Sequence, residues 1–215
     1  MRQDGRPFSN VAAMPRVSAD HLEARRDEII RAALRRFAED GFHATSVRDV
    51  IEESGLSAGA VYNYFPSKAE LIAGAVERIL QRLTGALDTA VAGDADRSPT
   101  EAAGGVLRQV LPALEADGVD YTRIAVTAWA EALRDPAVRE IVERVYGTVR
   151  RGLAQLVVRW RDAGHLPDDV DVEALAQVLL STLMGFIVQR AVLGDVDLDR
   201  YTGALALLLP RRSGA

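Results

Sequence analysis

The sequence contains no cysteine and only one lysine, Lys68, among its 215 residues. The absence of cysteine excludes disulfide bonds and thiolate metal sites, which agrees with a reducing, cytoplasmic location. The first residues contain no apolar core of the kind found in export signals, so nothing in them argues for secretion. Positive charge is scarce, since the formal net charge is −5 and residues 15–71 alone are slightly acidic. A large basic face, and with it strong non-specific binding to nucleic acid, is not expected.

Patterns for strands, metal sites and catalysis are also missing. Apolar residues recur at the i, i+3, i+4 spacing of helices, and the turns are not hairpin turns, so the protein is predicted to be all-α with about nine helices. The three histidines (His21, His43 and His165) are far apart and show no metal-binding spacing, so no metal or cofactor is expected. Residues 55–59 match the G-x-S-x-G motif of esterases, but that motif needs a preceding strand, and here a predicted helix precedes it. No enzyme activity is predicted.

The most informative stretch is residues 45–71, which reads as two short helices around a tight turn, followed by a third helix. Thr45 or Ser46 can cap the first helix, and Ser57 can cap the second. Gly55 provides the turn between them, because glycine readily adopts a left-handed conformation. A proline ends the second helix. Two helices joined by a few residues that include glycine describe a helix-turn-helix, whose second helix enters the major groove of DNA.

The residue types in the second helix suit contact with DNA. Gly59 lies inside a helix of about seven residues, where it costs roughly 1 kcal/mol relative to alanine, and a backbone that closely approaches a partner would explain it. Tyr62 and Tyr64 offer hydroxyl groups and Asn63 an amide, and such groups commonly contact phosphate and sugar. Lys68 falls in the first turn of the next helix, where the dipole disfavours a cation unless an anion such as phosphate is present. The alternative is a solvated lysine and half-buried tyrosines in an ordinary helical pair.

A family resemblance rests on these residues. Residues 57–71, SAGAVYNYFPSKAEL, resemble the DNA-binding signature of the tetracycline-repressor (TetR) family of bacterial regulators, and residues 29–45, IIRAALRRFAEDGFHAT, resemble that family's first helix. The segment Ile51-Glu52-Glu53 departs from the family, which often has Ile-Ala followed by polar and small residues. The resemblance implies an N-terminal three-helix helix-turn-helix domain over 19–66 and a helical ligand-binding and dimerisation domain over 67–215.

The resemblance also divides the matching residues by role. Arg48 would reach a guanine edge, where a bidentate contact is worth roughly 1–3 kcal/mol. Residues 57–60 would face the bases through apolar contact and close backbone approach, and the others would fix the register through phosphates. The predicted DNA-contacting residues are Ser46, Arg48, Ser57, Ala58, Gly59, Ala60, Tyr62, Asn63, Tyr64 and Lys68.

Beyond residue 67 the apolar spacing predicts longer helices. The first of them, over 67–91, starts at the expected phosphate contact and ends in another region, so it would connect two sites. Further helices are predicted at about 100–115 (kinked or split at Pro112), 120–133, 136–163, 171–193 and 198–209.

Residues 174–193 are apolar nearly all round, which by length alone invites a membrane-spanning interpretation. Burying polar side chains in lipid costs free energy, so no membrane partner is expected. The polar residues of this segment are Gln177, Ser181, Thr182, Gln189 and Arg190. A helix that is apolar on all sides is commonly covered in part by a second subunit. As similar helices do in the TetR family, those at 171–193 and 198–209 are predicted to form a homodimer interface.

Aromatic side chains fall on the inward faces of the C-terminal helices, and pockets between helices of a bundle are mostly apolar with a few polar groups. Each of these residues is also explained as ordinary core. The resemblance adds that family members bind a small molecule in this bundle, without assigning residues. The predicted pocket residues are Tyr121, Trp129, Glu131, Tyr146, Trp160, Met184, Phe186 and Gln189.

These observations predict a homodimeric transcriptional regulator, usually a repressor, that a small, largely apolar ligand releases from a palindromic operator in double-stranded DNA. Two alternatives stay open: a helical enzyme or small-molecule carrier with an incidental helix-turn-helix, and a DNA-binding adaptor controlled by a protein partner. A bundle without a cavity would favour the adaptor. The segment 1–18, with Arg2, Arg6 and Arg16, is either an arm that reaches the minor groove or a disordered tail.

Overall fold

The computed structural model describes residues 19–93 and 99–208, and within them it contains nine α-helices, one 3₁₀ turn and no strand. The prediction of an all-α protein is confirmed. The segment 1–18, on which a minor-groove arm was predicted, lies outside the described residues. In chain order the elements are α1 (Ala19–Ala44), α2 (Val47–Ser54), α3 (Ala58–Tyr64), α4 (Lys68–Gly93), α5 (Pro99–Leu114), η1 (Ala116–Gly118), α6 (Tyr121–Ala132), α7 (Pro136–Asp162), α8 (Val172–Leu193) and α9 (Leu198–Leu208).

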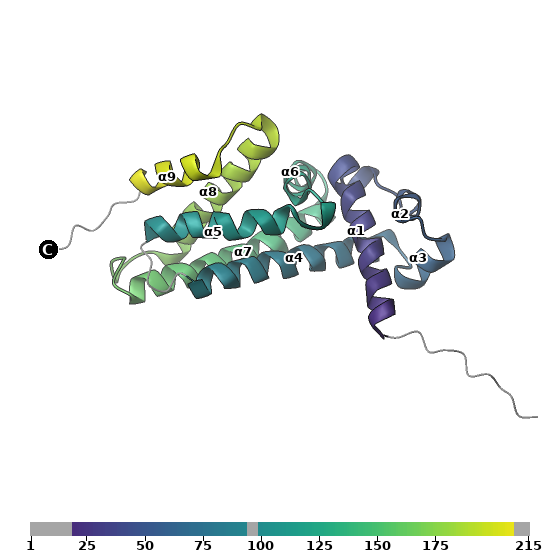
Figure 1. The fold of residues 1–215 in the computed structure, drawn as a ribbon, viewed down its shortest axis with the longest axis horizontal. Helices are drawn as coiled ribbons and strands as arrows, with labels where there is room; N and C mark the ends of the chain where they lie inside the picture. The colour runs from purple at the N-terminus through teal and green to yellow at the C-terminus, as the bar shows by residue number, and fades with distance from the viewer. Residues whose placement is uncertain (1–18, 94–98, 209–215) are drawn as a thin grey trace, which may run out of the picture.

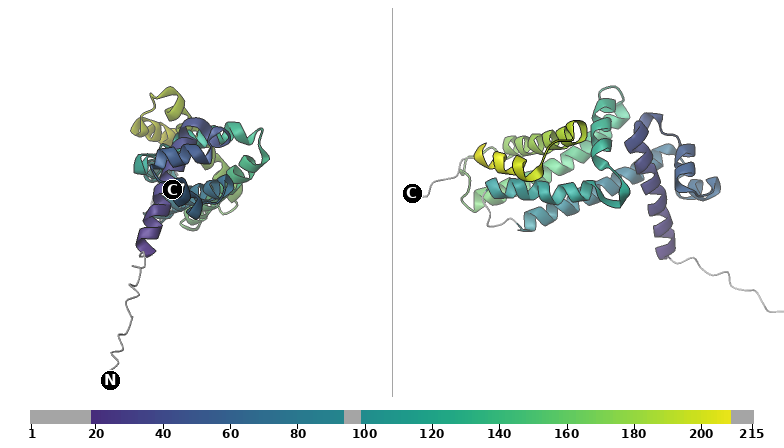
Figure 2. Two further views of the ribbon diagram at one scale, coloured as in Figure 1. Left: turned by 90° about the vertical axis from the view of Figure 1, so that its right-hand side faces the viewer. Right: turned by 45° about the horizontal axis from the view of Figure 1, so that its top comes forward.

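The helices form an elongated molecule with α1, α2 and α3 at one end (Figure 1). α4, α5 and α7 run along the long axis, and α1 crosses the end of α4, as the two further views also show (Figure 2). α6 lies where the two parts meet, since it packs on α1 as well as on α7 and α8. α4 likewise packs on α1 at its start and on α5 and α7. The division of the chain near residue 66 therefore stays a prediction, because two helices belong to the packing on both sides of it.

Capping residues explain most helix boundaries. The carboxylates of Asp120, Asp135 and Asp171 accept backbone N–H groups at the starts of α6, α7 and α8, at 3.0, 2.8 and 3.0 Å from Thr122, Ala137 and Ala174. Of the two forms expected for the helix at Pro112, a split is not observed. α5 is continuous, and its proline stands in the last turn, where it disturbs only the end of the helix.

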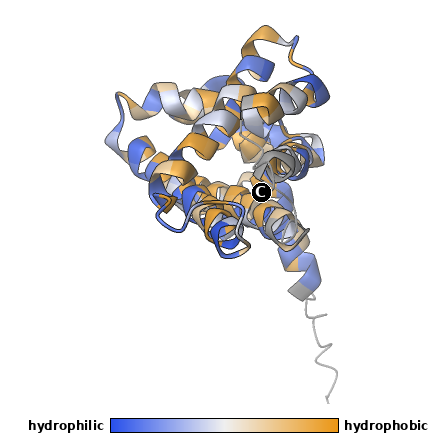
Figure 3. Cartoon of the chain, turned by 90° about the vertical axis from the view of Figure 1, so that its left-hand side faces the viewer, coloured by the Kyte–Doolittle hydropathy of each residue, from blue (hydrophilic) through white to orange (hydrophobic). Residues whose placement is uncertain are grey.

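Buried apolar side chains form one core that extends from α1 to α8. Hydrophobic residues gather around the middle of the bundle when it is viewed along its length (Figure 3). α8 is the exception, because it is long and apolar enough to cross a membrane, yet only 28% of its most apolar window is buried within the chain. Val178 and Val192 on this helix are 57% and 65% exposed. The expected burial of α8 on every side is therefore not achieved within one chain.

The end of α1 turns at Gly41, whose backbone angles (φ 83°, ψ 170°) lie in a region that only glycine adopts without strain. A Cβ atom added there would lie 2.3 Å from Glu131 Oε1 and 3.1 Å from Thr127 Cγ2 on α6. The chain can therefore turn here only because position 41 has no side chain, and that turn lets α1 pack against α6.

Replacing Gly41 by alanine is expected to lower the free energy of unfolding by about 2–3 kcal/mol, because strain and crowding add. Urea unfolding measures the loss. Gly55→Ala is the matched control, since that residue also has a positive φ (67°) but has nothing within 4 Å of an added Cβ, and we expect it to lose only about 1 kcal/mol. Equal losses for the two variants would contradict the greater combined strain and crowding at Gly41.

Candidate DNA-binding surface and ligand cavity

α2 and α3 are held at a fixed angle by local hydrogen bonds. Ser46 caps α2 through a reciprocal pair in which Asp49 N donates to Ser46 Oγ at 3.3 Å and Ser46 N donates to Asp49 Oδ2 at 2.7 Å. The hydrogen bonds from Ser46 lower the pKa of Asp49 and keep it ionised at the start of the helix. Gly55 ends α2 in the left-handed conformation (φ 67°, ψ 10°), and Ser57 Oγ accepts Ala60 N at 3.2 Å to begin α3. The sequence motif is confirmed as a helix-turn-helix.

α3 has one buried and one exposed face. Val61 is fully buried and anchors the helix to the core. On the opposite side, Ala58, Gly59, Tyr62 and Asn63 are exposed and share one face at i, i+1, i+4, i+5 spacing. A Cβ atom added at Gly59 would meet nothing within 4 Å. No part of the described chain covers this face, so it is open to an external partner.

The other predicted DNA-contacting residues lie around this face, and several have local partners. The Arg48 side chain is 85% exposed, and its Nε donates to Glu52 Oε1 at 3.0 Å. Lys68, predicted to contact phosphate, has a partner within the chain, because its Nζ donates to the carbonyl of His43 at 2.9 Å. Ser57 and Ser46 use their hydroxyl groups in capping. The DNA-contacting roles of all these residues stay predictions.

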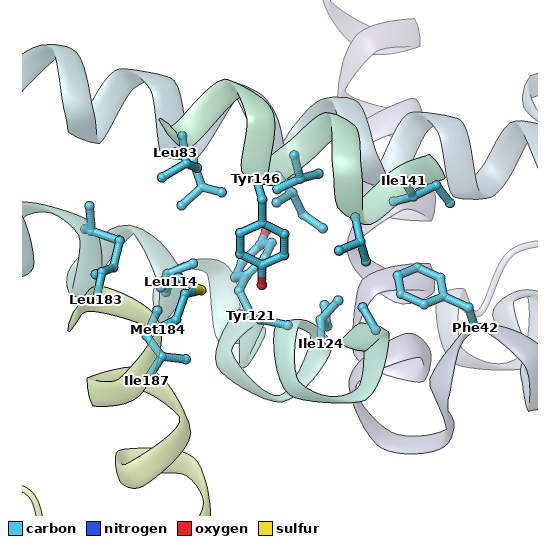
Figure 4. A pocket seen from close by; sticks show the side chains of 17 residues that line it. Phe42, Leu83, Leu114, Tyr121, Ile124, Ile141, Tyr146, Leu183, Met184 and Ile187 are labelled. Atoms are coloured by element: carbon cyan, nitrogen blue, oxygen red, sulfur yellow. The ribbon is translucent and has the colours of Figure 1, made fainter. Parts of the chain in front are cut away.

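The C-terminal bundle contains an apolar cavity between six helices. Seventeen side chains line it, from α1, α4, α5, α6, α7 and α8, and the cavity that they leave has a volume of about 60 Å³ (Figure 4). None of these seventeen is charged, and the only polar atoms with strong hydrogen-bonding capacity are the two hydroxyl groups of Tyr121 and Tyr146. An apolar space with a few polar groups is the usual form of a small-molecule site.

The two tyrosines differ in how their hydroxyl groups are satisfied. Tyr146 extends from α7 into the middle of the cavity (Figure 4). Burial raises the pKa of Tyr146 well above its ordinary value, partly offset by a side-chain hydrogen bond with Trp129, so the group stays neutral. Tyr121 is only 2% exposed, and its hydroxyl finds no hydrogen-bond partner within the described residues. A buried donor without a partner is costly, and it marks this wall of the cavity as the polar one.

Of the eight pocket residues predicted from the sequence, Tyr121, Tyr146 and Met184 line this cavity, and the other five do not. Trp160 and Phe186 are buried elsewhere in the core, and the Phe186 ring packs on Tyr201 at 4.9 Å. The Trp129 ring packs on the Tyr146 ring in a tilted arrangement, with ring centroids 5.5 Å apart. Gln189 is exposed on α8. Glu131 faces α1, where its Oε1 accepts the N–H of His43 at 3.4 Å.

Sequence reasoning missed a residue that joins the two parts of the molecule. Phe42, the neighbour of Gly41 on α1, lines the cavity together with residues of the bundle. Its ring also packs on Phe37 at 4.8 Å, deep in the core of the helix-turn-helix end. A phenylalanine after a glycine looks like ordinary core, so no signal distinguished it. The cavity is therefore walled in part by the DNA-binding end of the chain.

A second connection consists of ion pairs. The Arg82 guanidinium lies over the Tyr121 ring, 5.4 Å from its centroid, and pairs with Asp117 in η1. Asp117 also pairs with Arg78 at 3.4 Å, and Arg78 pairs with Asp27 on α1 at 3.2 Å. These side chains are only partly exposed, so the pairs are screened less than surface pairs. They form a chain of contacts from the cavity wall to α1.

An exposed recognition helix at one end and an apolar cavity in the adjoining helical bundle define a one-component DNA-binding regulator. Family models match both parts: "Bacterial regulatory proteins, tetR family" over residues 29–75, and "BetI-type transcriptional repressor, C-terminal" over residues 99–210. The chain belongs to the TetR family of bacterial transcriptional regulators. Members of this family bind DNA and act as dimers with small-molecule effectors.

Individual relatives agree along nearly the whole chain. The HTH-type transcriptional regulator YfiR of Bacillus subtilis is 30% identical over 88% of this chain and 90% of its own length. The HTH-type transcriptional repressor AcnR of Corynebacterium diphtheriae is 29% identical over 86% of this chain and 90% of its own length. Among solved structures, GusR of Salmonella enterica is 26% identical, covers 89% of this chain and 95% of its own, and superposes with a TM-score of 0.69.

Proposed function

We propose that this regulator binds a palindromic operator as a cytoplasmic homodimer and represses transcription until a small, largely apolar ligand enters the cavity and releases it from DNA. The observation that carries the ligand control is the position of Phe42, which belongs to the helix-turn-helix end and also forms part of the cavity wall. A ligand that contacts Phe42 acts directly on the segment that positions α3. The presence of an apolar cavity also argues against control by a protein partner alone. We propose no catalytic role.

The proposed release follows from geometry. Two recognition helices have to lie about 34 Å apart to enter successive major grooves. α4 runs from the helix-turn-helix to the cavity, where Ile79 and Leu83 line the wall. A ligand that fits only one setting of α4 and α6 relative to α1 would change the spacing, and it shifts the equilibrium by its differential affinity for the two settings. Selection of bound fragments from random DNA tests the proposal, and a sequence without two-fold symmetry would contradict it.

The proposed dimer interface is the outer surface of α8 and α9, where Val178 and Val192 are exposed together with Leu207 of α9. The two helices are joined within the chain, because the Tyr201 hydroxyl donates to the carbonyl of Thr182 at 3.2 Å. A second copy that packs on this surface by two-fold symmetry would bury these apolar residues on both subunits.

We expect Arg48→Ala and Lys68→Ala to weaken DNA binding in different ways. Arg48→Ala should lose roughly 1–3 kcal/mol of discrimination at one base pair of each half-site, because a guanine contact is specific. Lys68→Ala should weaken binding to all sequences alike and reduce the slope of log K against log salt by about one, as expected for one phosphate contact. Fluorescence anisotropy on operator and single-substituted duplexes at several salt concentrations measures both. Equal losses on every duplex for both variants would refute this division of roles. Circular dichroism should accompany Lys68→Ala, since Lys68 also holds His43.

A further inference from the structure

We infer that the cavity selects an uncharged ligand that carries one hydrogen-bond acceptor, such as a ketone, ester or ether oxygen, and that the Tyr121 hydroxyl donates to that acceptor. The inference rests on the proposed function for the role of the site, and it adds the chemical class of the ligand. Ionised ligands, whether carboxylates or amines, are excluded from this class.

The first argument is the chemistry of the cavity wall. None of the seventeen lining side chains is charged, so an ionised group that entered would have no partner of opposite charge there. Transfer of an unpaired ion into an apolar site is strongly unfavourable. Arg82 is the basic side chain in contact with Tyr121, but it stands over the face of that ring, and its charge is already paired with Asp117. It is not among the residues that line the cavity.

The second argument is the unsatisfied hydroxyl of Tyr121. This side chain lines the cavity, is almost completely buried, and its oxygen has no hydrogen-bond partner within residues 19–93 and 99–208. A phenol hydroxyl is both donor and acceptor, and a buried one normally has a partner. Trp129 donates to the Tyr146 oxygen, so that hydroxyl already takes part in one hydrogen bond, whereas the Tyr121 hydroxyl takes part in none and is the group that gains most from a ligand. An acceptor on an otherwise apolar molecule that reaches this hydroxyl would complete its hydrogen bonding.

One scaffold with four head groups tests the class of ligand. 2-Acetylnaphthalene carries a neutral acceptor, 2-isopropylnaphthalene has nearly the same shape without it, and 2-naphthoate and 2-naphthamidine carry a negative and a positive charge. Isothermal titration calorimetry on the intact dimer should give the tightest binding for the acetyl compound. We expect the two ions to bind on the order of a hundredfold more weakly than it, because they lose hydration without gaining a partner. Either ion binding as tightly as the acetyl compound would overturn the inference.

The hydroxyl is tested by Tyr121→Phe. We expect this variant to bind the acetyl compound about tenfold more weakly and the isopropyl compound unchanged, because only the acetyl compound accepts the hydrogen bond. Thr89→Val is the control, since it removes an exposed hydroxyl group on α4 that does not line the cavity, and it should leave all four affinities unchanged. If Tyr146→Phe, and not Tyr121→Phe, abolishes the difference between the two neutral compounds, the assignment of the donor is wrong.

The same samples separate this inference from the proposed function. Release of operator DNA is measured by anisotropy at saturating acetyl compound. Binding without release would contradict ligand control and leave the class of ligand intact. Failure of all four compounds to bind, with DNA binding retained, would overturn the inference and leave the DNA-binding part of the proposal standing.

Discussion

The double variant Val178→Asp/Val192→Asp is expected to be monomeric and to lose operator affinity by about two to four orders of magnitude, because one subunit engages only one half-site without the gain from linked binding. Both valines are more than half exposed on α8, so the substitutions should change the stability of the subunit itself by little. In a two-fold interface each substitution is present in both subunits, so each dimer buries both copies of each aspartate without a partner of opposite charge. This is strongly unfavourable. Sedimentation velocity measures the oligomeric state, and anisotropy on the operator measures the affinity.

Leu133→Asp is the matched control for this surface. Leu133 is 79% exposed, at the end of α6 and on neither of the two helices of the proposed interface, and its replacement introduces one negative charge at an exposed apolar position. It should leave both the dimer and the operator affinity unchanged. A double variant that stays dimeric would place the subunit interface elsewhere on the molecule.

The sequence predicted the helices and their limits well because the signals are local. Asp135 followed by proline, the left-handed Gly194 and the Ser57 cap act within a few residues of themselves, and the structure places each at a helix end. Pro112 shows the limit of such local signals. A proline predicts a break, but its position relative to the end of the helix decides whether a break is visible.

The cavity was only partly predictable, because periodicity shows which face of a helix turns inward and not what that face meets. Trp160 and Leu83 both point inward, yet Trp160 fills the core whereas Leu83 lines the empty space. The pocket was predicted mainly from large aromatic residues, but most of its wall consists of aliphatic side chains, which cannot be told from ordinary core in the sequence. The cavity arises where six helices fail to fill a common space, which no single segment of sequence encodes.

Long-range polar partners were equally hidden. Glu131 was predicted to serve the pocket, but the turn at Gly41 brings the backbone N–H of His43 to it from 88 residues away. Lys68 has the position expected of a phosphate ligand, and the same turn supplies it with a carbonyl partner. Both contacts depend on how α1 crosses the bundle. Backbone groups of a turn are not visible in a residue pattern, so sequence reasoning assigned these two side chains to external ligands.

Gly59→Ala is expected to change folding and DNA binding in opposite directions. An alanine in the interior of α3 should raise the free energy of unfolding by about 0.5–1 kcal/mol, because glycine is the poorer helix former and the added methyl group meets nothing within 4 Å of the chain. If the backbone at Gly59 approaches the bases closely, the same methyl group occupies the space of the DNA. At about 1 kcal/mol for each half-site, the dimer should bind its operator about thirtyfold more weakly. Urea unfolding and anisotropy on the operator measure the two effects.

Gly85→Ala separates the two effects, because Gly85 is also an exposed helical glycine with nothing near an added Cβ, but it lies on α4, far along the chain from α3. It should gain similar stability and keep full operator affinity. An added methyl group that stabilises the helix lowers operator affinity only if it lies on a surface that contacts the DNA. An operator affinity for Gly59→Ala as high as that of Gly85→Ala would mean that the open space beside α3 stays open in the complex. The recognition helix would then have to read DNA with Tyr62 and Asn63 held farther from the groove than we propose.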